Sequence, residues 1–266
     1  MTESQKLRVA VVQTDVTIGE PEANFARIAR RLEESVRQSP KPDVIVLPEM
    51  WNTGYALDRI AELADPGGER TQAAISAFSR EHGLHVIAGS VAQSAGGQVR
   101  NTIYAFDRNG ELSGEYSKIH LFRLMDEHKH LEAGERIGRV AVDGAQAAMM
   151  ICYDIRFPEL SRKLALEGAK VLFVPAQWPK PRLHHWRTLL TARAIENQMY
   201  VIACNRVGVS GDTAFFGHSM IIDPWGDIIA EGGEEETLLS AELDLGLVDE
   251  VRGRIPVFAD RRPTLY

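Results

Sequence analysis

The stretch around which the chain is organised reads Met150-Ile151-Cys152-Tyr153-Asp154-Ile155-Arg156-Phe157-Pro158-Glu159. It continues an apolar run that begins at Ala147, and such a run is typical of a buried strand. The pattern becomes helical from Pro158, a residue that suits the first turn of a helix because its missing N–H has no partner there. The thiol of Cys152 therefore lies where a strand gives way to a helix, a corner that favours negative charge. A lone cysteine at a strand end is more often a small core residue, so the rest of the chain decides its role.

The composition bounds the class of protein. The chain has 266 residues, of which 44% are hydrophobic, enough for a substantial core. Its net charge of -7 disfavours a nucleic-acid-binding surface, and it contains no run of 18 apolar residues that would indicate a membrane span. Residues 1–6 contain no apolar signal region. The two cysteines, Cys152 and Cys204, do not indicate a disulfide framework, so we expect a soluble cytoplasmic protein.

Predicted helices and strands alternate along the chain, with hairpins between them. Apolar residues at helical spacing predict helices at residues 23–38, 69–82, 158–167 and 183–198. Strands are predicted at residues 7–13, 43–47, 84–91, 170–175, 200–204 and 237–243, and hairpins at 102–116, 140–151 and 218–230. Several strands are apolar on both faces, which is typical of sheets buried between other layers. The alternation predicts an α/β fold of stacked layers without a linker or a repeat.

Two charged residues also close predicted strands. Glu49 follows Leu47-Pro48, and Lys118 follows Tyr116-Ser117. Taken singly, a solvated loop glutamate and a surface lysine are the commoner explanations. Together with Cys152 they form a coherent chemical set, in which the thiolate attacks, the carboxylate moves protons, and the lysine provides a fixed positive charge for the thiolate and for an oxyanion. The residues alone leave open whether the three corners meet in space.

The motifs resemble the signature stretches of the nitrilase superfamily of carbon–nitrogen hydrolases. Leu47-Pro48-Glu49, residues 116–121 and residues 152–159 match these stretches in order and spacing. The likeness continues through residues 192–197 and 218–226, so it spans nearly the whole chain. It implies an αββα sandwich of two facing mixed β-sheets with helices on both outer faces. It also implies association into a homodimer or larger homo-oligomer, and no metal or organic cofactor.

The resemblance further implies one domain over residues 1–266, with a C-terminal tail from roughly 244 to 266. Matched by position, Cys152 is the nucleophile that forms a thioester, Glu49 the general base and acid, and Lys118 the cation that stabilises the oxyanion. A second glutamate that is often counted with them falls on Glu127, for which a surface position in a charged loop is the alternative. The backbone N–H of Tyr153 supplies the second oxyanion donor.

Within the superfamily, the chain resembles the ω-amidase branch, and more narrowly the bacterial 2-oxoglutaramate amidases associated with methionine salvage. Residues 120–128, 152–159, 179–186 and 255–258 carry this likeness. Such enzymes cleave the terminal amide of a dicarboxylic acid monoamide and release ammonia. An N-carbamoyl amino acid hydrolase, a nitrilase and an aliphatic amidase remain open as alternatives. A non-catalytic scaffold on the same fold is a remote one.

A dicarboxylic monoamide carries a second carboxylate, which requires a cation in the site. Arg156 is the first candidate because a guanidinium grips a carboxylate through two hydrogen bonds, although an ion pair with Glu159 would equally explain it. Trp178 and Arg182 are weaker candidates for the pocket wall, and Trp178 also suits the core. The remaining histidines do not suggest a metal site: His120, His128, His130, His184 and His185.

Overall fold

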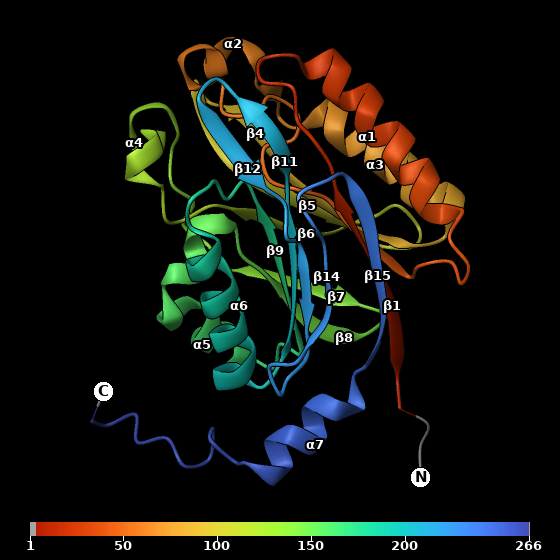
Figure 1. Cartoon of the computed structure of the whole chain (residues 1–266), viewed down its shortest axis with the longest axis vertical. Coiled ribbons are helices and arrows are strands. Elements are labelled where there is room, and N and C mark those ends of the chain that lie inside the picture. Colours follow the sequence, from red (N-terminus) through yellow and green to blue (C-terminus); the bar gives the residue numbers. More distant parts are fainter. Residues whose placement is uncertain (1–3, 266) are drawn as a thin grey trace.

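The computed structural model describes residues 4–265 of the chain. Residues 1–3, part of the segment predicted to contain no signal region, and residue 266, the end of the predicted tail, lie outside the described residues. Two mixed β-sheets face each other, and helices cover the outer face of each (Figure 1). Within the described range, no helix has both the length and the apolar character needed to cross a membrane.

The first sheet has the strand order β15-β1-β2-β4-β5-β6, with β3 beside β4. Its strands are β1 (Lys6–Gln13), β2 (Val44–Val46), β3 (Asp65–Pro66), β4 (His85–Ala95), β5 (Gln98–Phe106), β6 (Leu112–Ser117) and β15 (Thr237–Asp244). Strands β1, β2 and β4 run parallel, and β4, β5 and β6 form an antiparallel meander. Strands β2, β4 and β6 therefore end at the same edge of the sheet.

The second sheet has the order β14-β13-β10-β9-β8-β7. Its strands are β7 (Gly138–Val142), β8 (Ala145–Met149), β9 (Val171–Ala176), β10 (Tyr200–Asn205), β13 (Met220–Ile222) and β14 (Ile228–Glu231). Strands β8, β9 and β10 run parallel, so their carboxyl ends also share one edge. A separate hairpin is formed by β11 (Val207–Ser210) and β12 (Thr213–Phe216).

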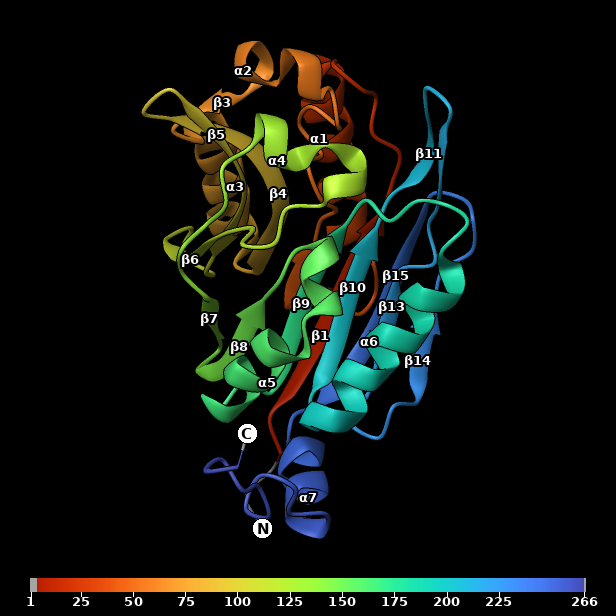
Figure 2. The same ribbon diagram turned by 90° about the vertical axis from the view of Figure 1, so that its left-hand side faces the viewer.

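The helices form the two outer layers and the connections. They are α1 (Pro21–Val36), α2 (Ile60–Leu63), α3 (Glu69–His82), α4 (Glu127–His130), α5 (Pro158–Leu166), α6 (Leu183–Asn197) and α7 (Gly246–Arg254), with short 3₁₀ turns η1 (Leu57–Arg59), η2 (Arg123–Met125) and η3 (Cys152–Arg156). Helices α1 and α3 lie outside the first sheet in Figure 1, and Figure 2 shows α5 and α6 across the second sheet. The predicted tail consists of α7 followed by irregular chain.

The side chains of β1 show how the layers divide the core. Leu7, Val9 and Val11 belong to the large cluster between the two sheets. Ala10 and Val12 point the other way, into the cluster beneath α1 and α3. Successive residues of a strand face opposite sides, so a strand covered on both faces must be apolar throughout. This burial fixes the strand ends, from which the polar residues of the candidate site project.

Candidate active site

The corner that carries Cys152 is a strained turn. After β8 the chain enters η3, and Cys152 adopts a φ of 44°, in the left-handed region that residues with a side chain rarely occupy. Such strain persists only where the surroundings impose it, and it is frequent at functional sites. The residue is 6% exposed and borders a pocket that Arg156 and Trp178 also line. The N–H of Tyr153 lies in the first turn of η3, where N–H groups have no partner within the helix.

Glu49 is fully buried and is held by four hydrogen-bond donors. Its Oε1 accepts hydrogen bonds from Tyr55 Oη (2.8 Å), Asn101 Nδ2 (2.8 Å) and Lys118 Nζ (2.9 Å), and its Oε2 accepts one from the Gln177 backbone N–H (2.7 Å). A buried carboxylate requires such partners, because burial without them is costly. These residues meet because each follows the end of a strand. Glu49 and Lys118 follow β2 and β6, and Gln177 follows β9 on the facing sheet. Asn101 and Gln177 were not predicted, since neither belongs to a motif considered in the sequence.

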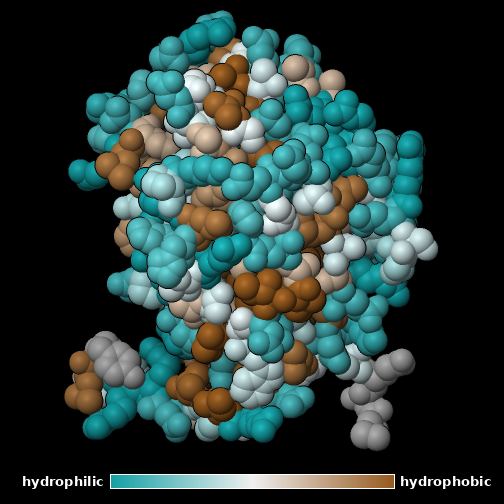
Figure 3. Space-filling model, viewed as in Figure 1, coloured by the Kyte–Doolittle hydropathy of each residue, from teal (hydrophilic) through white to brown (hydrophobic). Residues whose placement is uncertain are grey.

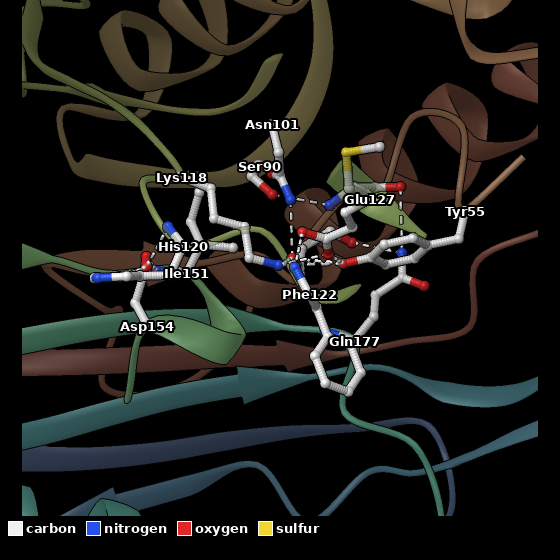
Figure 4. A network of polar contacts seen from close by, with 12 residues as sticks. Tyr55, Ser90, Asn101, Lys118, His120, Phe122, Glu127, Ile151, Asp154 and Gln177 are labelled. Carbon is white, nitrogen blue, oxygen red and sulfur yellow. Dashed lines mark hydrogen bonds and ion pairs between the residues drawn. The ribbon is translucent and has the colours of Figure 1, made fainter. Parts of the chain in front are cut away.

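Lys118 is the centre of the charged cluster in Figure 4. Its Nζ lies 2.6 Å from Glu127 Oε1 and 2.9 Å from Glu49 Oε1, and all three side chains are fully buried. Burial opposes the charged ammonium, but Glu127 and Glu49 outweigh it and raise the pKa of Lys118. Burial raises the pKa of Glu127, although the ammonium acts in the opposite direction. The structure therefore places Glu127 inside the cluster, not on the surface, and keeps Lys118 charged.

The thiol of Cys152 is held in its neutral form. Burial, followed by the charge of Glu49, raises its pKa well above the usual range, and Lys118 only partly offsets these effects. The sequence led us to expect a lysine charge that stabilises the thiolate and a carboxylate that takes the thiol proton. Burial and the two carboxylates outweigh the lysine charge, so the thiol keeps its proton.

Tyr55 joins the two glutamates and was missed in the sequence. Its Oη lies 2.8 Å from Glu49 Oε1 and 2.6 Å from Glu127 Oε1, as Figure 4 shows. Burial and the two neighbouring carboxylates raise the pKa of Tyr55, so the hydroxyl keeps its proton. One hydroxyl hydrogen can be donated to only one carboxylate at a time. Tyr55 lies six residues after Glu49 in an irregular loop. No sequence pattern there predicts its contact with the two glutamates.

We expect Tyr55→Phe to lower kcat by about ten- to a hundredfold, since a hydrogen bond to a charged group contributes about 1.5–3 kcal/mol. Steady-state kinetics of the purified variant would measure this. Tyr104→Phe is the control, because Tyr104 is buried and its hydroxyl donates to the Gly67 carbonyl, outside the cluster. Equal activity of the two variants would show that the Tyr55 hydroxyl does not organise the glutamates.

Two arginines line the pocket without a carboxylate partner. The Arg156 guanidinium lies 4.7 Å from the Trp178 ring centroid and its Nη2 lies 3.4 Å from His185 Nδ1. Arg182 lies 5.7 Å from the Phe122 ring centroid. Burial lowers the pKa of Arg156, and Arg182 acts in the same direction. Over residues 4–265 neither arginine forms an ion pair, so the alternative of an Arg156 pair with Glu159 is wrong.

Trp178 satisfies both interpretations made from the sequence. It is 3% exposed and packs against Trp186, yet it also lines the pocket beside Cys152. Its indole N–H donates to the Arg182 carbonyl (3.1 Å), which ties the pocket wall to the start of α6. Cys204 is fully buried in the core. Among residues 4–265 no group of three or more His, Cys, Asp or Glu side chains has a geometry that could hold a metal ion.

Comparison with known proteins identifies the family. A family model described as carbon-nitrogen hydrolase matches residues 8–253. The chain belongs to the carbon-nitrogen hydrolase family. A 2-oxoglutaramate amidase of Bacillus subtilis is 48% identical, over 98% of this chain and 100% of its own. An omega-amidase of Escherichia coli is 38% identical, over 96% of each chain.

A solved structure supports the fold of this carbon–nitrogen hydrolase. It is the crystal structure of a CN-hydrolase superfamily protein from Xanthomonas campestris with an arsenic adduct in the active site. The two structures have a TM-score of 0.89 and 31% sequence identity, over 97% of this chain and 98% of that one. The predicted αββα sandwich is thereby confirmed. The protein is an amidohydrolase that acts on carbon–nitrogen bonds.

Proposed function

We propose that this amidohydrolase cleaves the terminal amide of a dicarboxylic acid monoamide, with 2-oxoglutaramate as the preferred substrate and 2-oxoglutarate and ammonia as products. One observation carries the proposal. A thiol under the charge of a buried carboxylate opens onto a pocket that also presents the guanidinium groups of Arg156 and Arg182, neither of which forms an ion pair within residues 4–265. The first feature suits attack on an amide, and the second suits the far carboxylate of the substrate. The names of the Bacillus and Escherichia relatives support the same substrate class.

In the proposed acylation step, the Cys152 sulfur attacks the amide carbonyl as Glu49 takes the thiol proton. Negative charge develops on the carbonyl oxygen, which Lys118 and the Tyr153 N–H stabilise. Preorganised donors of this kind contribute several kcal/mol in a site without water. Glu49 then gives its proton to the leaving nitrogen, the carbon–nitrogen bond breaks, and ammonia departs. A thioester between the acyl group and Cys152 remains.

Deacylation reverses the same proton path. Water replaces ammonia, Glu49 removes one of its protons, and the oxygen attacks the thioester carbonyl. The carbon–sulfur bond breaks, Glu49 returns the proton to the Cys152 sulfur, and the carboxylic acid product leaves. Glu127 does not enter the proton path in this scheme. It holds the Lys118 ammonium through the 2.6 Å contact, so the cation stays in place through both steps.

The arginine on η3 gives the proposal a test of substrate recognition. We expect Arg156→Met to lower kcat/KM for 2-oxoglutaramate by about ten- to a hundredfold, because a charged hydrogen-bonding group contributes about 1.5–3 kcal/mol. Methionine keeps an unbranched side chain against Trp178, so the loss reports the charge and not the packing. Kinetics with an uncharged amide of similar length is the internal control and should change by less than about threefold. An equal loss for both amides would contradict the assignment.

Ammonia release from a panel of substrates tests the activity as a whole. The panel sets 2-oxoglutaramate and succinamate beside a neutral aliphatic amide, a nitrile and an N-carbamoyl amino acid. A preference for the two dicarboxylic monoamides supports the proposal. Preference for the nitrile or the N-carbamoyl compound would instead support the corresponding branch of the family and overturn the proposed substrate.

We also propose that the enzyme works in the cytoplasm, in methionine salvage, as a homodimer. Two free cysteines suit a reducing compartment. The face shown in Figure 3 is mainly hydrophilic, with hydrophobic residues in separate groups. Helices α5 and α6 contribute Leu166, 40% exposed, and Ile195, 51% exposed, and we propose that these helices form the interface. A monomer mass by light scattering at micromolar concentration would contradict the homodimer.

A further inference from the structure

Asp154 is fully buried and binds groups from two separate parts of the chain. Its Oδ2 accepts hydrogen bonds from the Ile151 N–H (2.9 Å) and from Tyr116 Oη (2.6 Å). Its Oδ1 accepts from the His120 N–H (3.2 Å) and lies 2.8 Å from His120 Nδ1. The imidazole of His120 is itself fixed by stacking on Phe157, with ring centroids 3.6 Å apart and planes 7° from parallel.

These partners surround the two residues that are proposed to do the chemistry. Tyr116 and His120 lie two positions before and two positions after Lys118, and Ile151 immediately precedes Cys152. The lysine follows β6 of the first sheet, and the cysteine follows β8 of the second sheet. The carboxylate of Asp154 therefore bridges the two sheets beside the candidate site. Figure 4 shows it with His120 and Ile151 at one end of Lys118, while Tyr55 and Glu127 lie at the other.

We infer that Asp154 is a positioning residue that fixes the Lys118 ammonium relative to the Cys152 thiol. The inference rests on the proposed roles of those two residues. A buried carboxylate that accepts four hydrogen bonds cannot move without leaving donors unsatisfied, so each corner restrains the other. The bond to the Ile151 N–H also holds the start of the turn in which Cys152 adopts its left-handed conformation. Asp154 itself acts only through these neighbours.

Asp154→Asn tests the inference, because asparagine keeps the shape and removes the charge and one acceptor. Asp65→Asn is the matched control. Asp65 is also buried and accepts hydrogen bonds from Thr71 N (2.8 Å), Thr71 Oγ1 (2.7 Å) and Arg70 N (3.2 Å) at the start of α3, outside the site. For 2-oxoglutaramate we expect Asp154→Asn to lower kcat by about tenfold or more with KM changed by less than about threefold, as for a loss of transition-state stabilisation. Asp65→Asn should lower the melting temperature similarly while keeping kcat within about twofold.

Alkylation of Cys152 by iodoacetamide, followed by peptide mass, provides a readout that needs no substrate. Lys118 lowers the pKa of the thiol, so a displaced lysine slows the reaction at pH 8. We expect Asp154→Asn to slow alkylation several-fold in the wild-type background and to cause no further slowing when Lys118→Met is present. Equal slowing in both backgrounds, or a kcat loss no larger than that of Asp65→Asn, would overturn the inference.

A second variant and the substrate-free readout cover the cases in which Asp154→Asn does not fold or the proposed function fails. If Asp154→Asn does not fold, Tyr116→Phe removes a single donor to the same carboxylate and should slow alkylation in the same background-dependent way. If the wild-type protein hydrolyses no dicarboxylic monoamide, the proposed function fails, while the alkylation experiment still decides whether Asp154 sets the distance between Lys118 and Cys152.

Discussion

Replacing Cys152 by alanine should abolish amide hydrolysis, with kcat reduced by about four orders of magnitude or more, as for loss of the nucleophile in a hydrolase with a covalent intermediate. The effect is large because the variant has no atom that can form the thioester. The fold should persist, since the side chain is small and the turn is held by Asp154. Ammonia release from 2-oxoglutaramate, together with a thermal unfolding curve, measures both expectations.

The second cysteine supplies the control for this experiment. Cys204 is fully buried, and its sulfur donates to the Val12 carbonyl at 3.2 Å, away from the pocket. Cys204→Ala should keep kcat within about twofold, because it removes only core packing. If Cys152→Ala retained substantial activity, or if Cys204→Ala lost it, the assignment of the nucleophile would be wrong.

Glu49→Gln should lower kcat by about a hundred- to ten-thousandfold, the usual contribution of a general acid–base group. Glutamine has nearly the same shape, but it cannot carry the proton from the thiol to the leaving nitrogen. The same substitution should make the thiol more reactive towards iodoacetamide. After burial, the charge of Glu49 is the next cause that raises the pKa of Cys152, so its removal lowers that pKa and increases the thiolate fraction at pH 8.

The opposite signs of these two effects distinguish a proton carrier from a structural residue. A merely structural glutamate would give slower turnover and either unchanged or slower alkylation. Glu159→Gln is the control, since Glu159 is exposed at the start of α5 and lies outside the site, so both rates should stay near those of the wild type. Faster alkylation by Glu49→Gln with full activity would contradict the proposed role.

Much of the fold could be predicted because the strands are covered on both faces and the helices on one. The helix predicted over residues 69–82 agrees with α3 at both ends, since Gly83 adopts the left-handed conformation that ends a helix. The strand predicted to reach Ile151 ends at Met149 instead. The N–H of Ile151 donates to the Asp154 side chain, a tertiary contact that apolar patterning does not contain. The β11–β12 hairpin was missed because its short strands form a sheet of their own, outside the two main sheets.

The candidate site, like the fold, could be predicted only as far as patterns within single elements reach. Glu49, Lys118 and Cys152 could be proposed because each closes a recognisable strand within a motif. Gln177 and Asp154 could not, because their contacts depend on how the two sheets face each other. Gln177 donates to Glu49 across 128 positions of sequence, and Asp154 meets Tyr116 across 38. Periodicity describes one element at a time, so it predicts the strand ends but not the side chains that the facing sheet brings to them.

The central claim is that a thioester at Cys152 lies on the path of amide hydrolysis, and trapping it is the most direct test. Wild-type enzyme turning over 2-oxoglutaramate would be quenched in acid within milliseconds and examined by intact and peptide mass spectrometry. We predict an adduct on the peptide that contains Cys152, with the mass of the substrate less that of ammonia, and none in Cys152→Ala. Ammonia release without any adduct, or with the adduct on another residue, would contradict the account.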